Sequence, residues 1–298
     1  MLSIVVYDDN LKTVEEMNRQ AISTISSLHF APTLKATNAL IQEGYHASKI
    51  FHTGNTAIDS ILRVATTPMP VTADATLLWL LNEAEPLPFG EGRLKAPRMI
   101  LLTTHRRENH NGGHGRIFQA ALHLCDLFDD LHFVIPLHPN PNVQREASKY
   151  LPLNKRGACI HVVPPTSYSI TVHLQKHSVI IMTDSGGLQE EASALQRPVL
   201  VLRQKSERME GVKAGIAQVV GTHDIQKIVR FASKLLQNEN EIYASMSKPK
   251  FPYGNGTAAQ RIVEIVENRY LHVLDDGDVG GDAVEHRKVV GRSFVPPR

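Results

Sequence analysis

A short segment with small, hydroxyl and carboxylate side chains follows an apolar run in the second half of the chain. Residues 185–187 (Ser-Gly-Gly) come after the apolar residues 178–182, and residues 188–195 are predicted to form a helix. A strand, a glycine turn and a helix N-terminus expose backbone N–H groups and about half a positive charge, which attract an anion. Glu190 and Glu191 suit hydroxyl groups and would repel a bare phosphate. This pattern favours a nucleotide sugar, with the diphosphate at the turn and the ribose at the acid; the alternative is an ordinary strand–helix turn.

A second polar segment contains a candidate proton-transfer group beside two guanidinium groups. His105 follows an apolar run, and an unperturbed imidazole has a pKa of about 6.5, which suits acid–base chemistry. Arg106 and Arg107 have forked donors that match phosphate or carboxylate, and Glu108 is close enough to bind one of them. The alternative is a charged surface turn.

For two further segments, a purely structural role explains the residue types as well as a functional role does. Glu15, Glu16 and Arg19 have the spacing of a solvated helix face. His138 begins the Pro- and Asn-rich residues 138–142, which also fit a helix entry with an Asn cap and an early proline. The residue types alone leave both alternatives open for each segment.

From residue 98 onward, short apolar runs alternate with helical patterns. The runs occupy residues 99–103, 133–137, 160–163, 179–182 and 199–202, and the predicted helices lie at about 115–129, 142–150, 168–175 and 187–196. This alternation predicts an α/β fold with a parallel sheet that is covered on both faces. Ligands of such sheets bind beyond the carboxyl ends of the strands. Four polar segments are expected at that edge, namely residues 105–108, 138–142, 184–187 and 203–210.

The first 97 residues are organised differently. The predicted elements there are strands at residues 28–31 and 49–51, with a helix at about 34–45 between them. Residues 64–97 are rich in Pro, Thr and Ala and predict a linker, with a surface helix near residues 75–83 that has Trp79 on its apolar face. At the other end of the chain, a final helix is predicted at residues 258–268.

Composition excludes several classes of protein. With 298 residues, 42% hydrophobic and 21% charged, the chain has the composition of a soluble globular protein. A net charge of +2 without a basic, aromatic stripe argues against nucleic-acid binding. No apolar window long enough for a membrane span occurs, and acidic residues come too early for a secretory signal. Cys125 and Cys159 are therefore expected to be free thiols in a reducing compartment, the cytoplasm.

Seven short motifs occur in order along the chain and together resemble the non-hydrolysing UDP-N-acetylglucosamine 2-epimerases. They lie at residues 15–19, 53–59, 105–108, 138–142, 183–191, 207–208 and 252–254. Each motif is weak alone, but their order and spacing are specific. The resemblance covers residues 14–270 and is poor over the linker 60–97.

The resemblance implies a GT-B architecture, in which two Rossmann-like domains face each other across a cleft. It also implies interconversion of UDP-GlcNAc and UDP-ManNAc without an external cofactor or a metal. In that family UDP is eliminated to leave 2-acetamidoglucal, and it is added again after the C2 proton has returned on the other face. Homodimers are common in the family, so a homodimer is expected here.

The resemblance assigns binding roles to five positions. Ser185 and Gly186 match diphosphate ligands, and Glu191 matches the ribose ligand. Arg208 lies on the nucleotide side, and Arg19 matches an arginine of the substrate cleft.

The resemblance also assigns chemical and regulatory roles. His105 and Glu15 match positions with acid–base or leaving-group roles. Arg106 and His138 match positions of an allosteric UDP-GlcNAc site in bacterial members.

The sequence also departs from the family pattern. The family's Gly-Thr-Arg-Pro-Glu, His-Gly-Asp and His-Val-Glu-Ala-Gly segments do not occur in it. The expected division is 1–59, a remnant of the N-terminal Rossmann-like domain; 60–97, linker and surface helix; 98–251, the UDP-binding Rossmann-like domain; 252–272, a crossing helix; and 273–298, a disordered tail. We expect weak UDP affinity and little or no turnover by the chain alone. The alternatives are a nucleotide-sugar-binding module and a GT-B glycosyltransferase.

Overall fold

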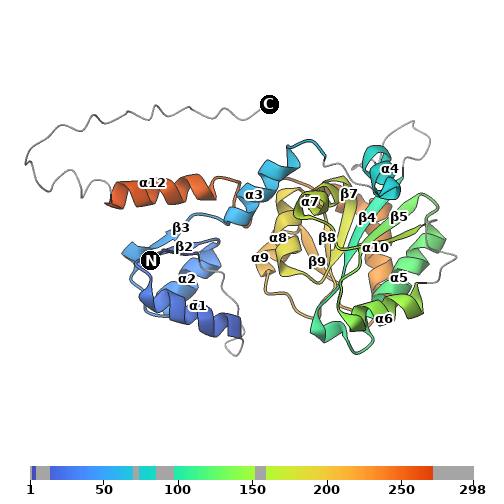
Figure 1. The fold of residues 1–298 in the computed structure, drawn as a ribbon, viewed down its shortest axis with the longest axis horizontal. Coiled ribbons are helices and arrows are strands. Elements are labelled where there is room, and N and C mark those ends of the chain that lie inside the picture. The colour runs from blue at the N-terminus through green and yellow to red at the C-terminus, as the bar shows by residue number, and fades with distance from the viewer. Residues whose placement is uncertain (1, 5–13, 70–73, 85–96, 152–158, 271–298) are drawn as a thin grey trace, which may run out of the picture.

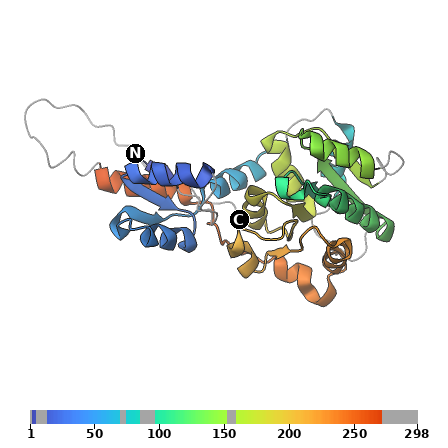
Figure 2. The same cartoon turned by 90° about the horizontal axis from the view of Figure 1, so that it is seen from below.

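Two units, each built on a parallel sheet, lie side by side in the molecule (Figure 1). The computed structural model describes residues 2–4, 14–69, 74–84, 97–151 and 159–270. The smaller unit has a three-stranded sheet and the larger unit a six-stranded one. The view from below shows the same separation, with helix α3 (Thr56–Ala65) between the units (Figure 2). The predicted tail, residues 273–298, lies outside the described residues.

The smaller unit is formed by the N-terminal residues. Its elements are β1 (Leu2–Ile4), α1 (Val14–Ile25), β2 (Leu28–Ala31), α2 (Leu34–Gln42), the 3-10 turn η1 (Ala47–Lys49) and β3 (Ile50–His52). The strands pair in the order β1-β2-β3, and both pairs are parallel. Helix α2 begins at Thr33, whose hydroxyl accepts the N–H of Ala36 at 3.2 Å. A small cluster of buried apolar side chains from β2, α2 and β3 holds these elements together.

The larger sheet has the strand order β6-β5-β4-β7-β8-β9, with every pair parallel. Its strands are β4 (Arg98–Thr103), β5 (Leu131–Pro136), β6 (Ile160–Val163), β7 (Ser178–Thr183), β8 (Val199–Val201) and β9 (Ala217–Val219). The chain first builds outward from β4 through β5 to β6, and then crosses to β7 and builds outward on the other side. The order therefore reverses between β4 and β7, and ligand crevices form at such a switch point.

Helices cover both faces of the larger sheet. They are α4 (Ala75–Glu83), α5 (Gly113–Leu127), α6 (Pro141–Tyr150), α7 (Tyr168–His177), α8 (Gly186–Ala194), α9 (Met209–Lys213), α10 (Ile225–Leu236) and α11 (Ile242–Met246), with 3-10 turns η2 (Arg107–Asn109) and η3 (Glu239–Glu241). Along β4, Ile100 and Leu102 face the core under α5, α6, α10 and α11, whereas Met99 and Leu101 face the core under α4, α7 and α8. This two-sided burial explains the uninterrupted apolar runs of the sequence.

Helices α3 and α4 pack against the larger unit. Helix α3 crosses the predicted boundary at residues 59–60, and its buried Ile58 and Ile61 contact Val172 of α7. Helix α4 has the predicted bounds, but Leu77, Leu80 and Leu81 are buried against the sheet whereas Trp79 is 44% exposed. The prediction that Trp79 lies on the apolar face is wrong, because the spacing of the leucines defines the buried side.

Helix α12 (Ala258–Tyr270) returns from the larger unit to the smaller one (Figure 1). The Asp59 carboxylate accepts the N–H groups of Ala258 and Ala259 at 3.2 and 2.8 Å, so α3 caps the start of α12. Near its other end, Arg269 donates to the Ser48 carbonyl at 2.9 Å. Most side chains between these two contacts are exposed or half-buried. Among the described residues, no helix combines the length and apolarity needed to cross a membrane.

The predicted strands and helices of the larger unit agree with the structure to within a few residues, but β9, α9, α10 and α11 were not predicted. Strand β9 has three residues, too few for a clear apolar alternation. Helix α10 does have a helical pattern, since Ile228, Ala232 and Leu235 share one buried face. The signal for α10 is therefore present in the sequence, although the helix was not among the predicted elements.

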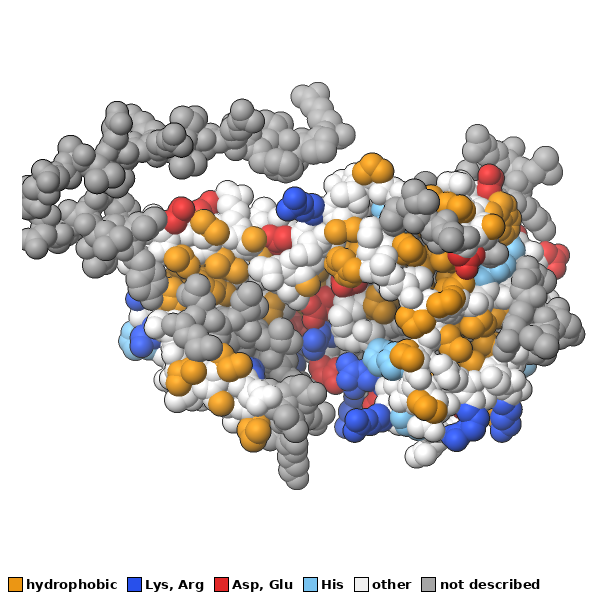
Figure 3. Space-filling view, in the orientation of Figure 1, with side chains coloured by type: hydrophobic (Ala, Val, Ile, Leu, Met, Phe, Trp, Pro, Cys, Tyr) orange, Lys and Arg blue, Asp and Glu red, His pale blue; other side chains and the backbone are white. Residues whose placement is uncertain are grey.

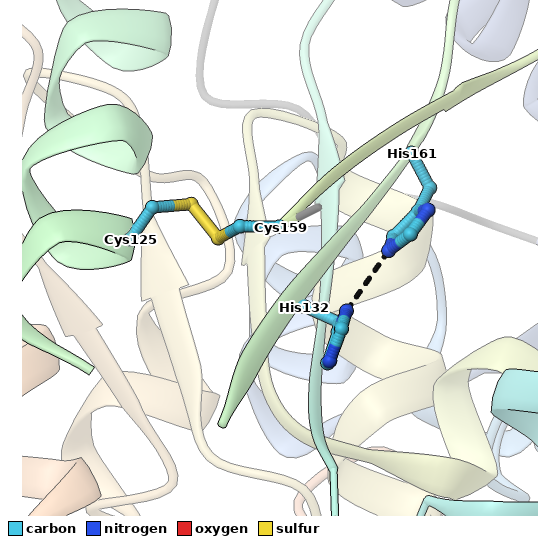
Figure 4. The surroundings of a disulfide bond; sticks show 4 residues. All are labelled: Cys125, His132, Cys159 and His161. Carbon is cyan, nitrogen blue, oxygen red and sulfur yellow. Dashed lines mark hydrogen bonds between the residues drawn. A yellow bond between two sulfur atoms is a disulfide. The ribbon is translucent and has the colours of Figure 1, made fainter. Parts of the chain in front are cut away.

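The cysteines form a disulfide, so the prediction of free thiols is wrong. Cys125 lies near the end of α5 and Cys159 directly precedes β6, and their Cα atoms are 6.0 Å apart (Figure 4). Among the described residues no free cysteine remains. Pairing of β5 with β6, and packing of α5 against both, bring together two residues that are 34 positions apart. Composition cannot predict such a tertiary approach.

Candidate functional site

The carboxyl ends of β4 and β7 are adjacent at the centre of the larger sheet, because these strands pair directly. The segment after β4 carries His105, and the segment after β7 carries residues 184–187. The segments after β5 and β8 flank these two, as the strand order requires. All four polar segments that the sequence placed beyond the strands therefore share one edge, at the switch point of the sheet.

The N-terminus of α8 lies at this edge. Ser185 is the N-cap residue, and its hydroxyl faces the N–H of Leu188 at 3.5 Å. A Cβ atom on Gly186 would lie 3.6 Å from the Arg208 guanidinium carbon, so this cation is next to the first turn of the helix. Gly187 is exposed. Backbone N–H groups, the helix dipole and a guanidinium group converge here, and together they suit an anion.

Glu190 holds Arg208 in place from inside the same helix. Its side chain is 9% exposed, and its carboxylate forms an ion pair with Arg208 and accepts a hydrogen bond from the Asn55 side chain. Burial raises the pKa of Glu190, and the Arg208 charge opposes that change. Asn55 belongs to the connection between β3 and α3. Glu190 thus links the anion site to the chain that joins the two units.

Glu191, the predicted ribose ligand, has different surroundings from its neighbour. Gln175 of α7 donates to Glu191 Oε2 at 2.7 Å. Burial raises the pKa of Glu191, and the bond from Gln175 opposes the shift. The structure therefore brings Glu190, and not Glu191, to Arg208.

A small hollow lies between the smaller unit and the start of α9. Its lining comes from Pro32, Thr33, Lys35 and Ala36 of the smaller unit and from Glu190, Glu207, Arg208, Glu210 and Tyr253. Acidic and basic side chains gather in this hollow between the units (Figure 3). The Thr33 hydroxyl donates to Glu210 at 3.0 Å, so the two units are in contact across it.

His105 is the candidate proton-transfer group at the switch point. Its side chain is 34% exposed, and Nδ1 lies 3.3 Å from the buried Asp184 carboxylate. Its ring stacks on His138 with centroids 5.3 Å apart. Burial lowers the pKa of His105, and Asp184 opposes the shift. His138 and Arg106, the predicted allosteric pair, are both exposed, and His138 directly contacts His105.

Helix α1 carries the other predicted site residues. Arg19, 8% exposed, donates to Glu16 at 2.9 Å and to Glu43 at 2.7 Å. Arg19 does not line the hollow described above. Glu15 lies within α1, but its side chain is outside the described part of the chain.

Tyr253 and Asn55 belong to two of the seven motifs, but the sequence assigns neither of them a role. The Tyr253 hydroxyl donates to the Arg208 carbonyl at 3.1 Å and accepts the Gly211 N–H at 3.0 Å. The Asn55 N–H in turn donates to the Tyr253 carbonyl at 2.8 Å. Tyr253 thus holds the backbone of Arg208, and Asn55 holds the backbone of Tyr253. No pattern of residue types indicates these roles.

A family model described as UDP-N-acetylglucosamine 2-epimerase matches residues 6–267. The chain belongs to the UDP-N-acetylglucosamine 2-epimerase family. The epimerase of Escherichia coli O157:H7 is 40% identical over 257 residues, which are 86% of this chain and 65% of that protein. A probable UDP-N-acetylglucosamine 2-epimerase of Ralstonia solanacearum is 38% identical over 253 residues, 85% of this chain and 64% of that one.

Solved structures of the same epimerase family share the fold. The crystal structure of UDP-GlcNAc 2-epimerase from Neisseria meningitidis bound to UDP-GlcNAc superposes with a TM-score of 0.72 at 36% identity, covering 87% of this chain and 67% of that one. The expected α/β architecture of GT-B type is thereby confirmed. This epimerase-family chain spans 64–65% of the length of the two curated relatives above. In the described part of the chain, no group of three or more His, Cys, Asp or Glu side chains is arranged to hold a metal ion.

Proposed function

We propose that this epimerase-family chain binds UDP-GlcNAc and its C2 epimer UDP-ManNAc in the cleft between its sheets and takes part in their interconversion, with the weak UDP affinity and the little or no turnover expected for the chain alone. The observation that carries the proposal is the N-terminus of α8, where free N–H groups and the Arg208 guanidinium converge. A diphosphate has the charge that such a site favours. UDP-GlcNAc is also the ligand of the Neisseria meningitidis relative.

The nucleotide contacts follow from this anion site. Ser185 and Gly186 bind the diphosphate, with Arg208 beside it. Glu191 accepts hydrogen bonds from the ribose hydroxyls, because a carboxylate has more acceptor sites than the bond from Gln175 uses. The hydrogen bond from Gln175 fixes the orientation of the Glu191 carboxylate. When the diphosphate binds, the Arg208 guanidinium gives up part of its ion pair with Glu190 and forms an ion pair with the diphosphate.

The reaction consists of an elimination and its reversal. A proton leaves C2, the C1–O bond breaks with its electron pair going to UDP, and 2-acetamidoglucal remains. A proton then adds to C2 from the other face, and a UDP oxygen forms the C1–O bond again. We assign His105 and Glu15 to proton transfer and leaving-group assistance, and Arg19 to the substrate. Because burial lowers its pKa, His105 is neutral near pH 7 and able to accept a proton.

Calorimetric titration of the purified chain with UDP tests the binding site. We expect saturable binding that Ser185→Ala weakens about fivefold, through loss of the cap and a donor. Glu191→Ala should weaken it about tenfold or more, through loss of a charged acceptor. Ser148→Ala and Glu264→Ala change exposed residues of the same types on α6 and α12 and should have no effect. The proposal fails if the folded chain does not bind UDP, or if all four variants behave alike.

Product analysis after incubation with UDP-GlcNAc identifies the reaction. UDP-ManNAc supports the proposed epimerisation without hydrolysis, whereas free ManNAc together with UDP indicates a hydrolysing epimerase. Transfer to an added acceptor indicates a glycosyltransferase.

A second candidate is a nucleotide-sugar-binding module without turnover. It is supported by the same anion site, because backbone N–H groups and a guanidinium group suffice to bind a diphosphate without performing a reaction. UDP binding without any change in UDP-GlcNAc would support this candidate.

We also propose a homodimer, which the resemblance implies, and a cytoplasmic location, which the composition implies. Light scattering checks the assembly, since a dimer has twice the 33.1 kDa mass of one chain. The Cys125–Cys159 disulfide is an observation against the cytoplasmic location, because disulfides are rare in a reducing compartment. Fractionation of cells that express the native protein tests the location.

A further inference from the structure

Asp184, directly after β7, is a fully buried carboxylate that is anchored by four donors. The Thr104 hydroxyl and the Asn109 side-chain amide each donate to it at 2.9 Å. The backbone N–H groups of His105 and Arg106 donate at 3.0 and 2.9 Å. All four donors belong to the segment that follows β4, so one side chain holds the whole segment against the neighbouring strand.

Neutral donors surround this buried carboxylate. A carboxylate without solvent requires compensation, and here neutral hydroxyl, amide and backbone groups supply it. Thr104 also bonds His114 Nδ1 at 2.8 Å, which extends the network away from the cleft. The imidazole of His105 also lies beside the carboxylate, with its Nδ1 atom 3.3 Å from Asp184 Oδ1.

We propose that Asp184 is a positioning residue for His105. It fixes the backbone of His105 through the N–H bond and holds Nδ1 of the imidazole on its own side, which leaves Nε2 for the substrate. The inference rests on the proposed function, in which His105 transfers protons. None of the site roles assigned from the resemblance includes Asp184.

The charges around His105 make this role measurable. Burial has the largest effect and lowers the pKa of His105. Asp184 raises it, while His138, Arg106 and Arg203 lower it further. Removal of the Asp184 charge should therefore move the His105 titration to lower pH.

The experiment is an NMR titration of the histidine side chains in the full chain and in Asp184→Asn, with His105 assigned by its loss in His105→Gln. We expect the His105 midpoint to fall by about one pH unit. Asp130→Asn is the matched control, since Asp130 is paired with Arg98 near the opposite ends of the strands and raises the pKa of His132. The control should move His132 and leave His105 unchanged.

An unchanged His105 midpoint in folded Asp184→Asn would overturn the proposal. If that variant does not fold, hydrogen exchange in the unmutated chain decides. The amides of His105 and Arg106 should exchange at least about a hundredfold more slowly than unprotected ones; unprotected rates would overturn the proposal.

UDP titration separates the proposed function from the proposed role of Asp184. A shifted His105 without UDP binding refutes only the proposed function, and UDP binding with an unshifted His105 refutes only the role of Asp184.

Discussion

Glu190 and Glu191 are neighbours in the sequence, yet their carboxylates have different partners. Successive residues of a helix point about 100° apart, so Glu190 meets Arg208 whereas Glu191 meets Gln175 of α7. The sequence indicates that two acids follow the glycine turn. Which acid pairs with the guanidinium depends on the neighbouring helices and the chain between the units.

At the residue scale, we expect Tyr253→Phe to destabilise the chain and weaken UDP binding. The substitution leaves the Arg208 carbonyl and the Gly211 N–H without their buried partner. An unmet buried polar group costs about 1–3 kcal/mol, and Arg208 also loses its support. Urea unfolding and UDP calorimetry measure the two effects.

Tyr45→Phe is the control for Tyr253→Phe. The Tyr45 hydroxyl makes no hydrogen bond among the described residues, although its ring contacts His29. Its loss should change the free energy of unfolding by less than about 0.5 kcal/mol. Equal effects of the two variants would show that the Tyr253 hydroxyl does not support the site.

At the element scale, the larger unit follows from short apolar runs with helices between them. Each run became a strand because it is buried on both faces, as Ile100 and Met99 illustrate on β4. The disulfide between α5 and the start of β6 had no such local signal.

We expect the double substitution of Cys125 and Cys159 by serine to lower the free energy of unfolding by about 4 kcal/mol. The bond closes a loop with a sequence separation of 34 and restricts the unfolded chain. Urea unfolding of the variant and of the oxidised chain measures the difference. Thiol titration of the denatured, unreduced protein is the control and should find no free thiol; two thiols would contradict the bond.

At the scale of the whole molecule, two chain crossings join the units. Gly54 and Gly254 meet there with positive φ angles of 92° and 113°, and a Cβ on Gly254 would lie 3.0 Å from the Gly54 Cα. Only glycine tolerates both the conformation and the approach. The crossings lie next to Asn55 and Tyr253, so the junction and the anion site share residues.

We expect the whole chain to lose stability as the pH falls from about 7 to 5. Burial lowers the pKa of His114 and of His161 to about 4. Below the unfolded value of about 6.5, the unfolded state binds protons that the folded state does not, so stability falls until about pH 4. At pH 5 each group removes about 2 kcal/mol. Urea unfolding at pH 7.5 and pH 5 measures the loss.

His114→Gln should reduce this pH dependence, whereas His223→Gln, at an exposed position, should leave it unchanged. Equal unfolding free energies at both pH values in the unmutated chain would contradict the prediction.

The sequence by itself determined the class of the larger unit and the place of its site. Apolar runs define buried parallel strands, and polar segments after them must meet at the carboxyl edge, where Ser185 and His105 were found. The strands and the polar segments after them can be predicted because each depends on residues that are close together in the sequence. Tertiary structure alone decided the Glu190–Arg208 pair, the four donors of Asp184, the contact of α3 with the larger unit and the disulfide. These contacts join groups from separate elements, which meet only when the sheets and helices have packed. No local pattern in the sequence indicates which distant residues will come into contact.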